Sequence, residues 1–117
     1  MQDQEFSSLR GKIITALEVS EDKTEVKFAT ADGEVFKLYH EQDCCEQVAL
    51  HEVVGNLEDL IGNPLLEAEA SSNQHDTGDG RTTWTFYKLG TIKGHVNLRW
   101  LGTSNGYYSE AVSFVRV

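Results

Sequence analysis

The sequence predicts a mainly β, single-domain protein, either an antiparallel β-sandwich or a partly open barrel with one short helix. Apolar and polar residues alternate with period two through residues 12–39 and 81–117, which is the pattern of half-buried strands. Turn-forming pairs such as Asp32-Gly33 separate these stretches. A chain of 117 residues, 39% of them hydrophobic, can also bury one core without disulfides or metals. We therefore treat residues 1–117 as one domain.

The first third predicts a three-stranded meander over residues 13–19, 24–30 and 34–40. The polar run at residues 20–23 forms the first turn, and Asp32-Gly33 predicts a tight hairpin because such turns favour positive φ. The side chains expected on the inner side of the second and third strands are Val26, Phe28, Phe36, Leu38 and His40.

The middle of the chain is less regular. Val48 and Leu50 indicate a short strand, and Asn56 is a plausible N-cap for a short helix near residues 56–61. Residues 65–70 can form another strand. The run at residues 71–80 is rich in Ser, Asn, Asp and Gly, so we expect a loop with local disorder there.

The last third is strongly β. Strands are expected over residues 82–89, 96–100 and 111–117, with Asn105-Gly106 as a turn. The aromatic residues expected to fill the core from this region are Trp84, Phe86 and Trp100.

The net charge of −9 is unevenly distributed. Residues 1–60 hold fourteen acids and five bases, whereas residues 61–117 hold five of each. Residues 38–80 contain ten acids and no Lys or Arg. Such a chain repels phosphate backbones and anionic lipids, so we expect neither direct nucleic-acid binding nor membrane binding. The acidity either keeps the protein soluble or attracts a basic partner.

Several motifs follow one another in a characteristic order and spacing. They occupy residues 38–46 (LYHEQDCCE), 59–66, 83–87 (TWTFY), 91–94 (TIKG), 99–100 (RW) and 104–110 (SNGYYSE). Together they resemble the signature of a family of small, uncharacterised proteins from phages and mobile elements, over about residues 9–114. The resemblance implies a phage or prophage origin and transfers no catalytic role to any residue.

Cys44 and Cys45 are adjacent, and His40 and His51 are the nearest histidines in the sequence. Adjacent cysteines rarely share one tetrahedral zinc, whose ligands are usually two or more residues apart. The alternatives are a buried structural role, a metal site and thiol redox chemistry. The polar segment 1–10 lacks the apolar stretch of a signal peptide and predicts a cytoplasmic protein in the host cytosol. Because the cysteines are adjacent and the setting is cytosolic, we expect neither bound zinc nor an intrachain disulfide. We also expect no cofactor.

The candidate functional residues fall into two groups. Glu41, Asp43 and Glu46 are expected on one loop, where they offer an acidic binding surface. Alternatively, His40, Asp43 and Glu46 form an acid–base group that Glu110 joins. Neither a nucleophile motif nor a glycine-rich phosphate cradle is present, which favours a binding protein over an enzyme.

The second group contains aromatic and cationic side chains from the end of the chain. Tyr107 and Tyr108 follow a turn and serve either packing or recognition, and Arg99 faces solvent or an acidic neighbour because it alternates with Trp100.

Two functions compete on these grounds. The first is a small acidic phage protein that binds a basic host protein as an anti-defence or host-takeover factor, with mimicry of nucleic acid as one mode of action. The second is a domain that sequesters a small ligand, such as a nucleotide signal, in a pocket lined by Arg99, Trp100, Tyr107 and Tyr108. A pocket with convergent Arg and Tyr groups would favour the ligand, and a flat acidic face would favour the protein partner.

Overall fold

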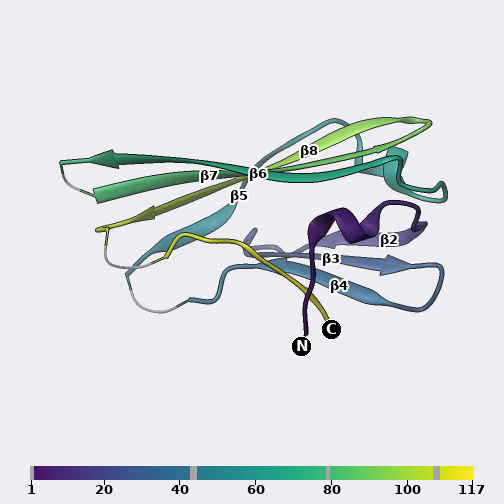
Figure 1. Cartoon of the computed structure of the whole chain (residues 1–117), viewed down its shortest axis with the longest axis horizontal. Helices are drawn as coiled ribbons and strands as arrows, with labels where there is room; N and C mark the ends of the chain where they lie inside the picture. Colours follow the sequence, from purple (N-terminus) through teal and green to yellow (C-terminus); the bar gives the residue numbers. More distant parts are fainter. Residues whose placement is uncertain (1, 43–44, 79, 107–108) are drawn as a thin grey trace.

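Two antiparallel β-sheets pack face to face in a sandwich about 45 Å long (Figure 1). This computed structural model describes residues 2–42, 45–78, 80–106 and 109–117. The prediction of a mainly β fold is confirmed, and the sandwich, rather than a closed barrel, is the form it takes. Among the described residues, helix is limited to two four-residue 3-10 turns, and neither is long or apolar enough to cross a membrane.

The first sheet has the strand order β1-β9-β4-β3-β2. Its strands are β1 (Gln2–Asp3), β2 (Ile14–Val19), β3 (Glu25–Thr30), β4 (Val35–Tyr39) and β9 (Ser113–Arg116). The predicted meander is confirmed as β2-β3-β4, and Gly33 takes the positive φ of 86° that its turn needs. A register shift between Ile14 and Ala16 turns Ile14 fully into the core.

The second sheet has the strand order β5-β8-β7-β6. Its strands are β5 (Gln47–Val54), β6 (Glu67–Thr77), β7 (Gly80–Thr91) and β8 (Gly94–Ser104). The prediction of a disordered loop at residues 71–80 is wrong, because most of this run pairs with β7 in one long hairpin. Its serine, asparagine and glutamine side chains have low strand propensity, and the pairing with β7 overrides that preference.

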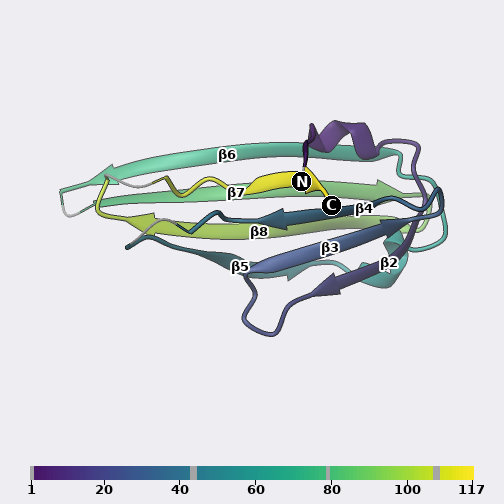
Figure 2. The same cartoon turned by 90° about the horizontal axis from the view of Figure 1, so that it is seen from below.

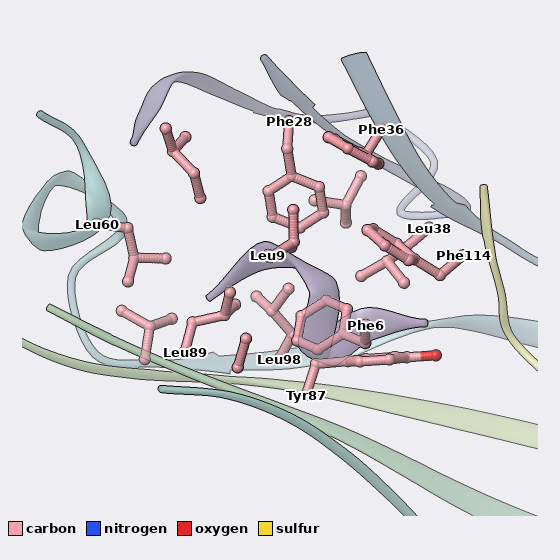
Figure 3. Close-up of a cluster of buried hydrophobic side chains, with 14 of the residues drawn as sticks. Phe6, Leu9, Phe28, Phe36, Leu38, Leu60, Tyr87, Leu89, Leu98 and Phe114 are labelled. Carbon is pink, nitrogen blue, oxygen red and sulfur yellow. The ribbon is translucent and has the colours of Figure 1, made fainter. Parts of the chain in front are cut away.

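The apolar core lies between the sheets and is centred on aromatic rings (Figure 3). Phe114 of β9 has ring neighbours Phe6, Phe28 and Phe36 at centroid distances of 5.1, 6.4 and 5.4 Å. Phe6 belongs to the 3-10 turn η1 (Phe6–Leu9), which packs against β6 and also brings its ring to Tyr87. The N-terminal segment thus closes one side of the sandwich.

The expected helix near residues 56–61 is the 3-10 turn η2 (Leu57–Leu60). Asn56 caps it as predicted, since its side-chain oxygen accepts a hydrogen bond from the Glu58 N–H at 3.0 Å. Thr91 of β7 donates to the Asp59 carbonyl, and this contact ties the turn to the second sheet.

The second sheet extends well beyond the first at one end (Figures 1 and 2). On the inner face of β7 the side chains change along the strand, from Leu89 and Tyr87 to Thr85, Thr83 and Arg81. The change occurs where the first sheet ends, so the inner face of the extended end of the second sheet is polar. Residues 40–42, which follow β4, and residues 109–112, which precede β9, lie beneath this polar end (Figure 1).

Candidate binding surfaces

The outer face of the second sheet carries a cluster that we call the aromatic face: His51, Trp84, Phe86, Arg99 and Leu101. Trp84 and Phe86 are neighbours on one side of β7, with ring centroids 6.3 Å apart and planes only 7° from parallel. The expectation that these two rings fill the core is wrong, because Tyr87 and Leu89, of the opposite parity, take the inward positions. Trp100 does lie in the core and is fully buried.

Arg99 links the aromatic face across strands. It pairs in register with Phe86, and its Cζ lies 5.3 Å from the Trp84 ring centre and 5.7 Å from that of Phe86. Its Nη1 donates to Glu52 Oε1 at 2.8 Å, as expected for a solvent-facing arginine beside an acid. His51 approaches Trp84 edge-on at 5.3 Å. The guanidinium is therefore held flat against the sheet by ring contacts and one ion pair.

The aromatic face is uncovered and nearly neutral. Of the residues that the structure describes, no segment lies over the outer side of the second sheet (Figure 1). Three acids and two bases point outward from this sheet, a balance of −1 in a chain of −9. They are Glu52, Glu67, Glu69, Lys88 and Arg99. Most of the negative charge thus lies elsewhere on the molecule.

A second feature is a polar pocket of about 570 Å³ at the extended end of the sheet. Its floor is a hydrogen-bonded group centred on Glu110, whose side chain is only 1% exposed. Arg81 Nε and Nη2 donate to the two carboxylate oxygens at 2.8 and 2.9 Å, and Thr83 and Ser104 donate through their hydroxyls at 2.9 and 2.7 Å. The remaining lining includes the polar side chains of Ser72, Gln74, Thr85 and Ser109.

These contacts keep Glu110 ionised. The Arg81 guanidinium, aided by the two hydroxyls, lowers the pKa of Glu110 although burial opposes the shift, and Glu110 in turn raises the pKa of Arg81. Gly102 allows the close approach, since a Cβ there would lie 2.5 Å from the Glu110 Cβ. The network fastens the segment before β9 to the polar end of the second sheet.

A second buried pair, His40–Glu46, stabilises the connection that follows β4. His40 Nδ1 donates to the Ala111 carbonyl at 2.7 Å, and its Nε2 lies 3.0 Å from Glu46 Oε1. The two side chains are only 5% and 0% exposed. The expectation that Glu46 contributes to an acidic binding surface is therefore wrong, because its buried side chain is a structural partner of His40. The main-chain oxygen of Glu46 also accepts a hydrogen bond from Gln42 at 2.8 Å.

The other predicted site residues are dispersed. Glu41 is exposed beside the His40 loop, whereas Asp43, Tyr107 and Tyr108 lie outside the described residues. Arg99 and Trp100 point to opposite faces of β8, so the expected pocket that contains both is wrong. Cys45 is disulfide-bonded, which contradicts the expectation of no disulfide, and Cys44 also lies outside the described residues.

The acids of residues 38–80 do not form one flat surface. Glu46 is buried, Glu52 is paired with Arg99, and Glu58 lies in η2. Glu69 and Asp76 are exposed on opposite sides of β6. Within the part of the chain that the structure describes, no group of three His, Cys, Asp or Glu side chains is placed to hold a metal ion.

Sequence reasoning missed Arg81 and assigned Trp84 and Phe86 to the wrong face of their strand. Arg81 had no recognisable motif, because its partner Glu110 is 29 positions away. For Trp84 and Phe86 the sequence did contain a warning. Tyr87 and Leu89 form an equally apolar face on the same strand, so either pair could have been the inward one.

A family model described as a domain of unknown function (DUF7448) matches residues 7–114. No curated protein and no solved structure matches the chain.

Proposed function

The chain belongs to this DUF7448 family, and we propose that it is a binding protein that docks a basic protein partner on the aromatic face. The observation that carries the proposal is an uncovered sheet face on which two large rings, Trp84 and Phe86, gather with Arg99. Most other large rings that the structure describes are buried in the core. Tryptophan and arginine are the residues that most often dominate the free energy of protein–protein binding.

The geometry of the cluster suits an anchor. Trp84 and Phe86 stand parallel and are partly exposed, and Arg99 is already held against them. These side chains therefore lose little conformational entropy when a partner covers them, which lowers a usual cost of docking. The polar neighbours Asn73, Thr82 and Thr103 surround the rings on the same face, which is the usual arrangement of an apolar centre with a polar rim.

The charge distribution favours a basic partner. A net charge of −9 attracts cationic proteins over long distances and raises their association rate. The near neutrality of the aromatic face lowers the desolvation cost at the point of contact. In this proposal the dispersed acids attract the partner over a distance, and the aromatic face makes the contact. The acids therefore need not lie on one face.

The resemblance to proteins of phages and mobile elements supports a host protein as the partner, with the anti-defence or host-takeover role as its context. Nucleic-acid mimicry is less well supported, because the acids are spread over both sheets and one of them, Glu46, is buried.

The alternative, a small-ligand domain, rests on the polar pocket. Its hydroxyl and amide lining suits a small polar molecule. An anionic ligand such as a nucleotide is disfavoured there, because Arg81 is bound on two nitrogens by Glu110.

The test compares two aromatic variants on opposite sheets. Trp84→Ala removes a ring that contacts Arg99, whereas Tyr39→Ala removes the ring that Lys37 contacts, 4.5 Å away, on the first sheet. Each folded variant is used to capture proteins from host lysate, and the captured protein is then titrated at low and physiological salt.

Capture by the wild type and Tyr39→Ala, loss by Trp84→Ala, and weaker binding at higher salt are expected. Equal capture by both variants would show that the binding surface lies elsewhere. An affinity that does not change with salt would contradict a basic partner.

A further inference from the structure

The outer edge of β6 is a long, regular strand edge. The pairing of β6 with β7 runs without a register shift from Glu67–Gly90 to Thr77–Gly80. The other edges are different: β2 and β5 both contain register shifts, and β1 has two residues. Residues 69–76 of β6 are all exposed, while η1 packs only beside the start of the strand (Figure 2).

The direction of the β6 backbone groups follows from the hairpin. Thr77 and Gly80 pair across a two-residue turn, so Thr77 and every second residue before it bond to β7. Ala70, Ser72 and Gln74 therefore direct their main-chain N–H and C=O groups away from the sheet. Among the described residues, no group bonds to these main-chain atoms.

Natural proteins usually protect such an edge with Lys, Pro or a bulge. The strand reads EAEASSNQHDT and contains none of the three. Its outward main-chain groups thus form a template for one more strand.

We propose that a second copy of this chain supplies that strand, with the two β6 edges antiparallel about a two-fold axis at Ser72. In this register Ala70 pairs with Gln74 of the other copy, and both of these residues direct their main-chain groups outward, as the pairing needs. Three such pairs, counting the central Ser72 pair, supply about six main-chain hydrogen bonds.

The side chains of β6 are self-complementary in the same register. Glu69 lies opposite His75 of the other copy, and Ser71 lies opposite Asn73. These are the closely spaced, non-hydrogen-bonded pairs, in which side chains meet most directly. Both Glu69 and His75 are exposed on the outer face. The register places no acid opposite another acid, which matters for two chains that each carry −9.

The dimer has a consequence for binding. A two-fold axis perpendicular to the sheet joins the two second sheets into one continuous eight-stranded sheet with both outer faces on the same side. The two aromatic faces then lie side by side. The dimer interface contains no residue of the aromatic face, so the dimer and the proposed function can be tested independently.

Sedimentation of the full chain from micromolar to millimolar concentration tests the dimer. A reversible species of twice 13.1 kDa is expected. Ser72→Pro removes the central N–H from both copies and should weaken the dimer by about tenfold or more, whereas the matched control Ser72→Ala keeps the N–H and the dimer. Circular dichroism establishes that each variant is folded.

Charge exchange tests the register and decides the matter if Ser72→Pro does not fold. Glu69→Lys and His75→Glu should each weaken the dimer, and the double variant should restore it, because Lys then faces Glu. A chain that stays monomeric at all concentrations, or a dimer that none of these changes weakens, would overturn the proposal.

Discussion

Replacement of Glu110 by Ala should destabilise the domain strongly, although it removes one side chain from an irregular segment. The carboxylate accepts one bond each from the Thr83 and Ser104 hydroxyls and a two-pronged contact from Arg81. All of these bonds end on a charged carboxylate, and a bond to a charged group contributes about 1.5–3 kcal/mol before solvent access is considered. Since water can enter from the open pocket, we expect a net loss of about 3 kcal/mol in the free energy of unfolding.

The assay is urea unfolding of the wild type and of Glu110→Ala at several pH values, with intrinsic fluorescence as the readout. The pKa of Glu110 is lowered from its ordinary value of 4.5 in the folded state. Its stabilising contribution is therefore fully present above pH 4.5 and is lost as the pH falls through the lowered folded-state pKa. The difference in stability between the two proteins should shrink correspondingly in acid.

The matched control is Glu41→Ala, which removes an exposed acid near the same end of the sandwich. It should change stability by no more than about 0.5 kcal/mol. If Glu110→Ala proves as mild as this control, or if its effect does not diminish in acid, the Arg81–Glu110 network does not hold the segment before β9.

Three further predictions concern the packing around these elements. Gly102→Ala should cost about 2 kcal/mol by urea unfolding, because the new Cβ meets Glu110 at 2.5 Å; unchanged stability would mean that the segment shifts freely. Phe114→Ala should cost about 3 kcal/mol through loss of its ring contacts, and a loss below about 1 kcal/mol would contradict its central place in the core. Burial raises the pKa of Tyr87 above its ordinary value of 10, so absorbance titration should show one tyrosine that ionises only on alkaline unfolding, and stability should fall above pH 10.

The sequence predicted the first sheet closely because its strands follow a simple rule. Val26, Phe28, Phe36 and Leu38 share one face at period two, with Lys27 and Lys37 between them, and all four are fully or almost fully buried. In such strands one face is apolar and the other polar, so composition alone specifies which face is buried. The bulge at Ile14 escaped this reasoning, because a one-residue insertion leaves no compositional mark.

The orientation of β7 was ambiguous for a physical reason. Both of its faces carry large apolar groups, Trp84 and Phe86 on one side and Tyr87 and Leu89 on the other. Period-two alternation cannot choose between two such faces, and only the contacts with the first sheet decide. Tyr87 and Leu89 lie where that sheet packs, and the ring of Phe6 closes over Tyr87 at 4.6 Å.

The same limit explains why the sequence predicts a loop from residue 71 onward, although β6 continues to Thr77. Where the second sheet passes the end of the first, neither face of β6 meets an apolar layer, so its inward residues Ser72 and Gln74 can be polar. Such a strand has no hydrophobic period for sequence reasoning to find. Its main-chain bonds to β7 hold it in place. These interactions specify register less strongly than a buried apolar face would. Because this part of β6 pairs only with β7 among the described residues, its other edge stays available for pairing. The position of β6 beyond the end of the first sheet therefore explains both its lack of an apolar pattern and its capacity to pair with another strand.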